Sequence, residues 1–422
     1  MNKNFKNTLI AISAIMMSAV VFLGGYLVGR SAFDKDIETV NYILEMYKKY
    51  YYEETDDLVG VIENALLDKY SEYYTKEEYD VVKKTSLGKR SGVGLSFYSD
   101  SNKIMRAVNN SPAGFAGIKP NGVLVAIDYN GKRTTIDTTE ERNKAFSAIP
   151  DDTEFSLIID YDGVRQSYAV KKEEYTETFV TYYDETGEYG FTGKSGSISY
   201  ARTGDNQEYP LGGKNKTGVI KYTGFSGLGS GNEGSAGQFK KALDTFKENG
   251  KTVLILDLRN NGGGYMNILE SVSAHLIDAE KASKQLVSYA IYKDKKKSSF
   301  YSEAVDYSDY NYEKIIILAN ENSASASEAL MGAVLDYDKN SIVTVIVEKS
   351  YREGKPVYKT YGKGIMQSTY TRITGEAIKL TTAKIYWPKT GISIHDIGIN
   401  PDLDERIIGS DNAFYDALSL SR

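Results

Sequence analysis

Three short segments of the sequence hold the residue types that an acyl-transfer reaction needs. The first, residues 256–264 (LDLRNNGGG), leads from an apolar run into three consecutive glycines. Glycine lets the backbone approach a ligand closely, so the amide N–H groups near Gly263 and Gly264 could stabilise an oxyanion. Taken alone, the same pattern is also that of an ordinary turn between a strand and a helix.

The second segment, residues 319–330 (ANENSASASEAL), follows an apolar run and begins a predicted helix. A serine at a turn from a strand into a helix presents its hydroxyl near backbone N–H groups and the positive end of the helix. Ser323, Ser325 and Ser327 all lie at this turn. Serine is also a common N-terminal cap of helices, so the segment does not by itself identify a nucleophile.

The third segment, residues 360–367 (TYGKGIMQ), places Lys363 between two glycines and beside apolar residues. Burial disfavours an ammonium group and lowers the pKa of a lysine, so a buried Lys363 could act as a general base. A solvated lysine is the plain alternative. If the segment is helical or tightly turned, Gln367 lies on the same face as Lys363.

The composition narrows the chemistry further. The 422 residues include no cysteine and only two histidines, His275 and His395, which lie outside the three segments. A thiol nucleophile, a disulfide framework and a cysteine-ligated metal are therefore excluded. The 51 Lys and Arg against 57 Asp and Glu give a net charge of −6, unlike a general nucleic-acid binder. We expect hydrolysis without histidine, metal or other cofactor, and no nucleic-acid partner.

Alternating strands and helices must bring the three segments together. Residues 237–249 and 325–335 have helical patterns, and the polar stretch 184–216 is expected to be a surface excursion. Four apolar runs are typical of buried strands: 217–222, 252–258, 314–318 and 342–347. This alternation indicates an α/β domain with crossover connections.

A smaller β-rich module precedes this domain. Short β-like runs and turn signals alternate between residues 86 and 171. Gly92 and Gly94 surround Val93 just before the run that begins at Leu95, and the N–H groups of such a turn can form a nest for a carboxylate. Residues 111–118 (SPAGFAGI) are compatible with a short helix packed on the sheet.

The N-terminal part is predicted to anchor the chain in a membrane. Leu9–Val28 is twenty residues without a charge, about 30 Å as a helix. We expect an uncleaved transmembrane helix after a cytoplasmic stretch, 1–8, and a single-pass protein of the cell membrane with its catalytic part extracytoplasmic. A cleaved signal or a buried helix are the alternatives. Residues 29–85 are predicted to be a helical lead-in whose apolar stripes could pair two copies in a homodimer.

In their order along the chain, the three segments resemble those of the carboxy-terminal processing proteases, also called tail-specific proteases. Residues 67–74 (LDKYSEYY) resemble the family's lead-in motif, with Lys-Tyr where Pro-His is usual. Residues 380–388 and 398–402 resemble its closing strands. Residues 86–174 resemble the family's PDZ domain, with Asn121-Gly122 where Gly-Asp is usual.

The resemblance implies an α/β multidomain fold. Behind the transmembrane helix, the lead-in and the PDZ-like module, residues 175–422 would form a serine protease core with the sheet type of crotonase and ClpP. PDZ modules add a peptide as a strand and hold its terminal carboxylate. The peptide-binding residues would be Gly92, Val93, Gly94 and Leu95.

The resemblance also implies roles for the site residues. Ser325 would be the nucleophile, with Ser323 and Ser327 as alternatives. Lys363 would be the base, and Gln367 would orient it. The oxyanion would be bound by backbone N–H groups of the Gly263 or Gly264 region and of Ala326.

The implied activity is that of a serine endopeptidase whose protein substrates are recognised by exposed C-terminal tails. Lys363 follows Ser325 by 38 positions, more than the family leads us to expect, and the excess around 347–355 is predicted to be a longer hairpin. If that hairpin displaces Lys363, the chain is an inactive peptide-binding or scaffold protein of the same fold.

A crotonase-like acyl-CoA enzyme is a third hypothesis. The PDZ-like module could also move as a unit and gate the site.

Overall fold

The computed structural model describes residues 35–50, 57–98, 100–192, 199–227 and 231–421. They belong to two compact units, one within Met1–Leu67 and the other within Asp68–Arg422. The first unit contains helices α2 (Lys35–Tyr50) and α3 (Leu58–Leu66). Ile37, Val40 and Ile43 of α2 are exposed, and pairing of two copies through this stripe stays a prediction.

Among the described residues, no helix is both long enough and apolar enough to cross a membrane. The longest, α2, has 16 residues, about 24 Å, and its sequence carries charges along its length. This finding contradicts the transmembrane helix that we included in the fold class and, with it, the predicted single-pass location in the cell membrane. The predicted span itself, Leu9–Val28, lies outside the described residues.

The second unit begins with a short strand and a helix, followed by a β-rich module with its own core. Residues such as Ile104, Leu124 and Leu157 are fully buried in that core. The strands form a four-stranded sheet in the order β6-β5-β7-β8 and two separate pairs, β2–β9 and β3–β4. The elements are β1 (Glu72–Tyr74), α4 (Lys76–Ser86), β2 (Lys89–Gly92), β3 (Leu95–Phe97), β4 (Ile104–Ala107), α5 (Pro112–Phe115), β5 (Val123–Tyr129), β6 (Lys132–Thr135), α6 (Thr139–Ala148), β7 (Glu154–Tyr161), β8 (Val164–Lys171) and β9 (Glu173–Thr176).

An eight-stranded sheet forms the centre of the α/β core, in the order β12-β11-β10-β13-β14-β17-β18-β23. It is parallel from β13 to β23 and antiparallel from β10 to β12. The strands are β10 (Val180–Asp184), β11 (Gly187–Thr192), β12 (Ser199–Gly204), β13 (Thr217–Tyr222), β14 (Val253–Asp257), β17 (Lys314–Ala319), β18 (Val343–Glu348) and β23 (Ile407–Ser410).

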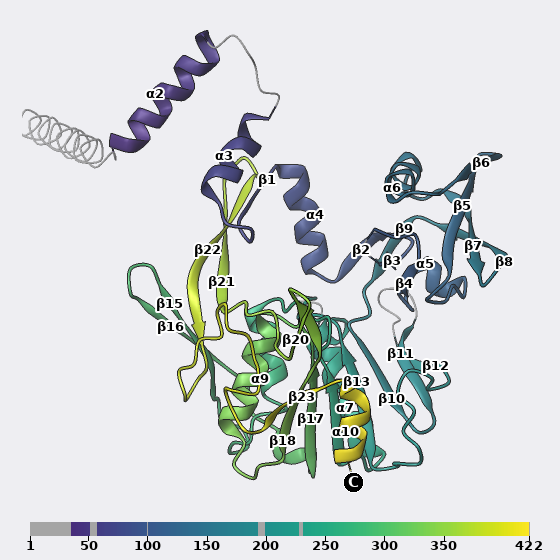
Figure 1. Cartoon of the computed structure of the whole chain (residues 1–422), viewed down its shortest axis with the longest axis vertical. Coiled ribbons are helices and arrows are strands. Elements are labelled where there is room, and N and C mark those ends of the chain that lie inside the picture. Colours follow the sequence, from purple (N-terminus) through teal and green to yellow (C-terminus); the bar gives the residue numbers. More distant parts are fainter. Residues whose placement is uncertain (1–34, 51–56, 99, 193–198, 228–230, 422) are drawn as a thin grey trace, which may run out of the picture. The chain divides into compact units, whose positions relative to one another are not determined.

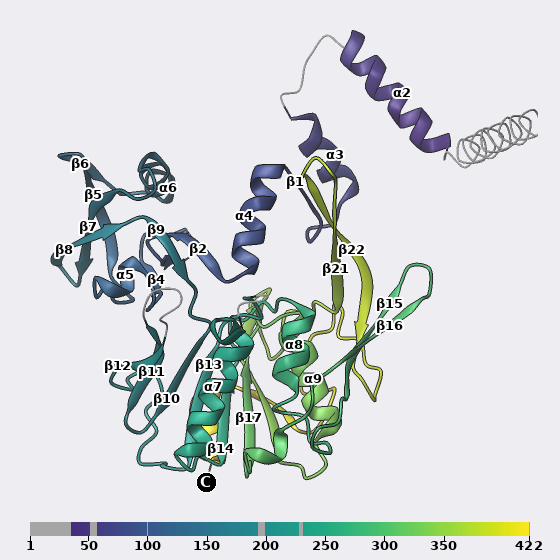
Figure 2. The ribbon, with the colours of Figure 1, turned by 180° about the vertical axis from the view of Figure 1, so that it is seen from behind.

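Helices cover both faces of this sheet, as Figures 1 and 2 show. Alternate strand residues point to opposite faces, so Leu254 and Leu256 pack toward one group of helices, while Ile255 packs toward the other face. Helices α7 (Ser235–Glu248), α8 (Met266–Ser273) and α9 (Ala326–Tyr337) cover the first face, and α10 (Ala413–Leu420) covers the second. The predicted α/β core and its four parallel strands are confirmed.

A second sheet of five strands stands beside the first. Its central strand, β22 (Ala377–Tyr386), pairs with β21 (Ile365–Thr371), with β1 and with β15 (Leu286–Tyr292), which in turn pairs with β16 (Lys297–Tyr301). The hairpin expected within residues 347–355 is present as β19 (Ser350–Arg352) and β20 (Lys355–Val357).

The stretch 184–216 differs from its predicted role as a surface excursion. Strands β11 and β12 extend the central sheet there. Tyr209 and Leu211 are buried within the core on the α10 face. The stretch is polar and rich in glycine, and its few apolar residues are irregularly spaced, so no hydrophobic period marks it.

Candidate active site

Ser325 lies in the turn that joins β17 to α9. Its φ of 56° and ψ of −115° place it in a region that residues other than glycine rarely adopt. Its backbone N–H donates to Glu328 Oε2 (2.9 Å). Its hydroxyl donates to no described residue; it faces the backbone N–H of Glu328 in a capping box, and its side chain is only partly buried. A strained turn that presents a free hydroxyl before a helix is the arrangement of serine nucleophiles in several hydrolases.

The hydroxyls of the two neighbouring serines are hydrogen-bonded within the protein interior. Ser323 and Ser327 are fully buried. The Ser323 hydroxyl donates to the carbonyl of Leu258 (2.8 Å), and the Ser327 hydroxyl donates to the carbonyl of Asn261 (2.9 Å). Of the three candidate serines, Ser325 alone has a hydroxyl available for chemistry.

The glycine turn packs directly against Ser325. Gly263 has a φ of +94°, and a Cβ there would lie 2.8 Å from Ser325 Cβ, so only glycine fits. Asn261 holds the turn: its side chain donates to the carbonyl of Tyr222 (2.8 Å), and its Oδ1 accepts the N–H of Gly263 (2.9 Å). The Asn261 carbonyl accepts the N–H of Ala324 (3.0 Å).

These contacts show which of the three predicted oxyanion donors already have a hydrogen-bond partner. The N–H of Gly263 is engaged by Asn261. The N–H groups of Gly264 and Ala326 donate to no described residue. The structure therefore leaves Gly264 and Ala326 free to bind a developing negative charge, as an oxyanion site requires.

A buried ion network supports the strand end that leads into this turn. Asp257, at the end of β14, forms an ion pair with Arg259 (2.7 Å) and accepts the hydroxyl of Tyr209 (2.6 Å). Arg259 also pairs with Glu348 of β18 (2.9 Å). The network links β14 to β18, on either side of β17, at the edge of the sheet that carries the site. Sequence reasoning missed Tyr209, because it lies in the stretch that we took for a surface excursion.

Glu328 joins the serine turn to the lysine segment. Its fully buried carboxyl group accepts hydrogen bonds from the backbone N–H groups of Ser325, Gly362 and Lys363, each at 2.9 Å, and from the hydroxyl of Thr360 (2.5 Å). Burial raises the pKa of Glu328, whereas the four donors lower it. The net effect is a raised pKa, and the four hydrogen bonds hold the carboxyl group between the two segments. The sequence signal was the acidic residue three positions after Ser325, which resembles an ordinary capping box.

Lys363 is partly buried at the start of the segment that becomes β21. Burial lowers its pKa below the usual lysine range, and the positive charge of Lys379 lowers it further. Its Nζ lies 4.8 Å from the ring centroid of Tyr70. No hydrogen bond joins Lys363 Nζ to Ser325 Oγ, although both residues are described, so the two groups are not in direct contact.

Gln367 lies within β21, so the segment is extended rather than helical or tightly turned. The pairing of β21 with β22 shifts register between Met366 and Gln367, so the spacing of four positions does not by itself place Gln367 on the side of Lys363, although both residues line the same cavity. Its Nε2 donates to Thr381 Oγ1 (3.2 Å) and makes no hydrogen bond with Lys363.

One cavity of about 730 Å³ is lined by all six predicted catalytic and oxyanion residues. These are Ser325, Lys363, Gln367, Gly263, Gly264 and Ala326. The rest of its wall is mostly apolar and includes Met266, Phe300, Ile365, Ile385, Trp387 and Ile394. A cavity of this size can hold several residues of a peptide beside the serine.

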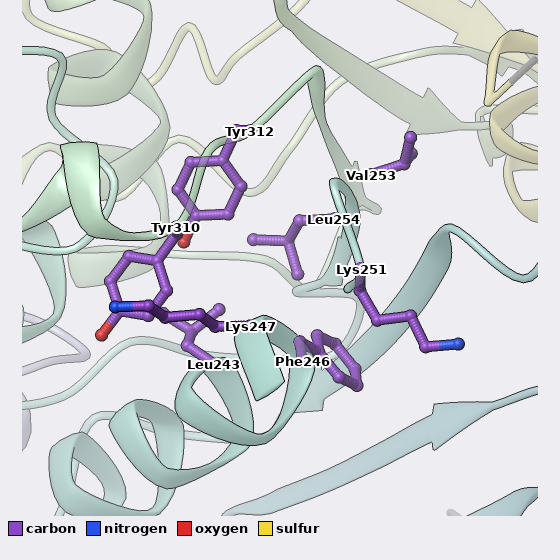
Figure 3. Close-up of a pocket in the computed structure, with 8 residues that line it drawn as sticks. All are labelled: Leu243, Phe246, Lys247, Lys251, Val253, Leu254, Tyr310 and Tyr312. Carbon is purple, nitrogen blue, oxygen red and sulfur yellow. The ribbon is translucent and has the colours of Figure 1, made fainter. Parts of the chain in front are cut away.

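A second hollow, drawn in Figure 3, has a volume of only about 10 Å³, enough for at most one water molecule. It lies beside α7 and β14, away from every predicted site residue. Its wall consists of Leu243, Phe246, Lys247, Lys251, Val253, Leu254, Tyr310 and Tyr312. Within the described residues, no group of three His, Asp or Glu side chains is placed to hold a metal ion.

The predicted carboxylate loop lies between β2 and β3. Gly94 has a φ of +81°, and a Cβ there would meet Ser111 Oγ at 2.1 Å. The N–H groups of Val93 and Gly94 donate to no described residue. Leu95 begins β3, which pairs along one edge with β4, and no described strand occupies its other edge. Free N–H groups beside an open strand edge could hold the end of an added peptide.

Comparisons with known proteins agree with this geometry. Residues 216–404 match the model of Peptidase family S41. A "Probable CtpA-like serine protease" of Staphylococcus aureus (strain MRSA252) is 28% identical over 412 residues, which cover 94% of this chain and 70% of that protein. The "Carboxyl-terminal-processing protease" of Synechocystis sp. is 26% identical over 391 residues, covering 89% and 78% of the two chains.

A solved structure supports the fold. A Bacteroides fragilis protein assigned to the S41 proteases superposes with a TM-score of 0.50 and 14% sequence identity, covering 88% of this chain and 90% of that one. At this identity, the similarity concerns the fold alone.

Proposed function

We propose that Ser325 is the nucleophile and Lys363 the general base of this serine-type peptidase, whose residues 216–404 match Peptidase family S41. The observation that carries the proposal is the free hydroxyl of Ser325, held at a strained φ beside the unpaired N–H groups of Gly264 and Ala326. Ser325 and Lys363 line the same cavity. No histidine is needed, since an amine with a lowered pKa can accept the serine proton.

The reaction follows from this arrangement. Lys363 takes the proton of Ser325 while the serine oxygen attacks a peptide carbonyl, and the N–H groups of Gly264 and Ala326 bind the oxygen that becomes negative. Proton return from Lys363 to the leaving amine gives an acyl-enzyme, which water then hydrolyses. Lys363 must first leave the face of Tyr70, and its flexible four-carbon stem allows this without moving the backbone that Glu328 holds.

We further propose that the β-rich module, residues 86–174, binds the exposed C-terminal tails of protein substrates. The free N–H groups of Val93 and Gly94 would hold the terminal carboxylate, and the open edge of β3 would pair with the tail. The module has its own buried core, which allows it to act as a unit that gates the site.

The test of the nucleophile is cleavage of a tagged peptide library by the full chain, read by mass spectrometry. We expect Ser325→Ala to lower cleavage by about 10⁴-fold or more with an unchanged melting temperature. Ser327→Ala is the matched control, because it removes a hydroxyl of the same turn that faces the interior. Undiminished turnover by Ser325→Ala would contradict the assignment, and an unlabelled Ser325 in the presence of a serine-directed probe would favour an inactive peptide-binding protein.

A further inference from the structure

Three lysines line the large cavity, and of these only Lys379 forms an ion pair with a described carboxylate. Lys363 is the proposed base, and Lys379 forms an ion pair with Glu72 (3.1 Å). Lys69 is different: its Nζ donates to the hydroxyl oxygen of Tyr361 (2.8 Å), and no carboxylate of a described residue lies within ion-pair distance. A positive charge at the edge of a substrate cavity therefore has no carboxylate counterion among the described residues.

The ammonium group of Lys69 is nevertheless held in place. It lies 5.0 Å from the ring centroid of Tyr70 and 5.1 Å from that of Tyr361, and the Tyr70 hydroxyl donates to the Tyr361 oxygen (3.2 Å). An ammonium group carries three N–H donors, of which Tyr361 uses one. Tyr70 lies close enough to take a second, which leaves at least one N–H to bind a ligand without breaking this arrangement.

Lys69 is also close to the proposed chemistry. The Nζ of Lys363 lies 4.8 Å from the centroid of the same Tyr70 ring that Lys69 faces. An extended peptide advances about 3.3 Å per residue, so a group bound by Lys69 would lie only a few residues from a bond attacked beside Lys363.

We propose that Lys69 binds a carboxylate of the substrate, so that the peptidase prefers peptides with a negative charge near the cleaved bond and an apolar residue beside it. The inference rests on the proposed function of Ser325 and Lys363. A charge-assisted hydrogen bond supplies the selectivity for the acid, and the apolar wall at Phe300 and Trp387 accepts the neighbouring side chain. The carboxylate comes either from an Asp or Glu side chain or from the C-terminus of the substrate.

The experiment uses the full chain and one neutral, apolar peptide in which a single Glu is moved from position to position. Each peptide has a Gln counterpart, and each is made with a free and with an amidated C-terminus. We expect kcat/KM for the best Glu peptide, or for the free acid, to exceed that of its neutral counterpart about fivefold, and salt to reduce the ratio. The Glu/Gln arm and the acid/amide arm identify the source of the carboxylate.

Variants assign the effect to Lys69. Lys69→Met should bring the ratio of kcat/KM for the acidic and neutral peptides to one, and Lys69→Arg should retain the preference. Lys84→Met, which removes the same charge from the exposed end of α4 outside the cavity, should leave the ratio unchanged. Equal cleavage of acidic and neutral peptides by the wild type, or an unchanged ratio in Lys69→Met, would overturn the inference.

Binding of the same peptides to Ser325→Ala, measured by fluorescence anisotropy, separates this inference from the proposed function. If acidic peptides bind in a Lys69-dependent way but the wild type cleaves none of them, the carboxylate site stands and the nucleophile assignment fails. If peptides are cleaved and bound without regard to charge, only the carboxylate site fails.

Discussion

The two sides of the large cavity are built differently. On the serine side, the turn between β17 and α9 follows a central strand, and the buried hydroxyls of Ser323 and Ser327 donate to carbonyl groups of the glycine segment. On the lysine side, Lys363 precedes β21 in the smaller sheet, and its Nζ faces the ring of Tyr70 without a hydrogen bond to any described residue. Glu328 connects the two sides through backbone N–H groups.

This difference means that the serine turn is preformed, whereas the lysine side chain must still move into place. The strained backbone of Ser325 and the free N–H groups beside it persist because the packed core fixes them. The lysine backbone is fixed by Glu328, but its side chain is free to turn. Formation of the reactive pair is thus a side-chain event on the lysine side, and variants on the two sides should fail in different ways.

The largest effect is expected at Lys363 itself. Lys363→Ala removes the proposed base but none of the hydrogen bonds of the core, so kcat/KM should fall by about 10³-fold or more with little change in melting temperature. Single-turnover kinetics with a tagged peptide would measure the loss. Lys359→Ala, four residues earlier, serves as the control, and full activity in Lys363→Ala would disprove the role.

Glu328→Gln should damage both sides together. An amide offers one acceptor oxygen and turns an NH₂ group toward backbone donors, so at least two buried hydrogen bonds are lost. The free energy of unfolding should fall by about 2–4 kcal/mol, and cleavage should fall as well. Denaturant unfolding compared with that of Glu405→Gln, an exposed site, would show the difference. A variant as stable and active as the wild type would mean that the connection is dispensable.

The pH dependence of kcat/KM should report on the lysine side of the cavity alone. The base acts as a neutral amine, so kcat/KM should rise with pH through the lowered pKa of Lys363 and then level off. Lys379→Met removes a neighbouring positive charge, raises that pKa and moves the rise to higher pH. Lys384→Met, an exposed position of the same strand, should leave the profile in place; identical profiles for all three proteins would show that Lys379 has no influence.

The smallest effect on chemistry is expected at the buried serines. Ser327→Ala leaves the Asn261 carbonyl with one donor fewer, so the free energy of unfolding should fall by about 1–3 kcal/mol. Cleavage per folded molecule should stay near the wild-type value. Thermal unfolding together with active-site titration would separate the two quantities, and a large loss of cleavage in a fully folded variant would reopen the choice of nucleophile.

Much of the core could be predicted from sequence, because strands such as Val253–Asp257 and Lys314–Ala319 contain four or more consecutive apolar residues. The family match and the relatives confirm the resemblance to the carboxy-terminal processing proteases. The choice among Ser323, Ser325 and Ser327 could not be made from sequence, because it depends on which hydroxyl the tertiary structure leaves without an acceptor.

Other features depended on long-range contacts. Glu328 meets Thr360 and Gly362 only when α9 and the lysine segment pack together, over more than thirty positions. Tyr209 reaches Asp257 from a stretch with no hydrophobic period. Neither contact leaves a local pattern, and local patterns are what sequence reasoning can detect.

The availability of one hydroxyl at position 325 has a practical consequence in a chain without cysteine. Replacing Ser325 with cysteine would create the sole thiol of the molecule, at the partly open end of α9. Its rate of alkylation as a function of pH would report directly on thiolate formation beside Lys363, free of any background from other sites. The molecule thus offers a clean chemical reporter for the approach of amine and nucleophile, even when no substrate is known.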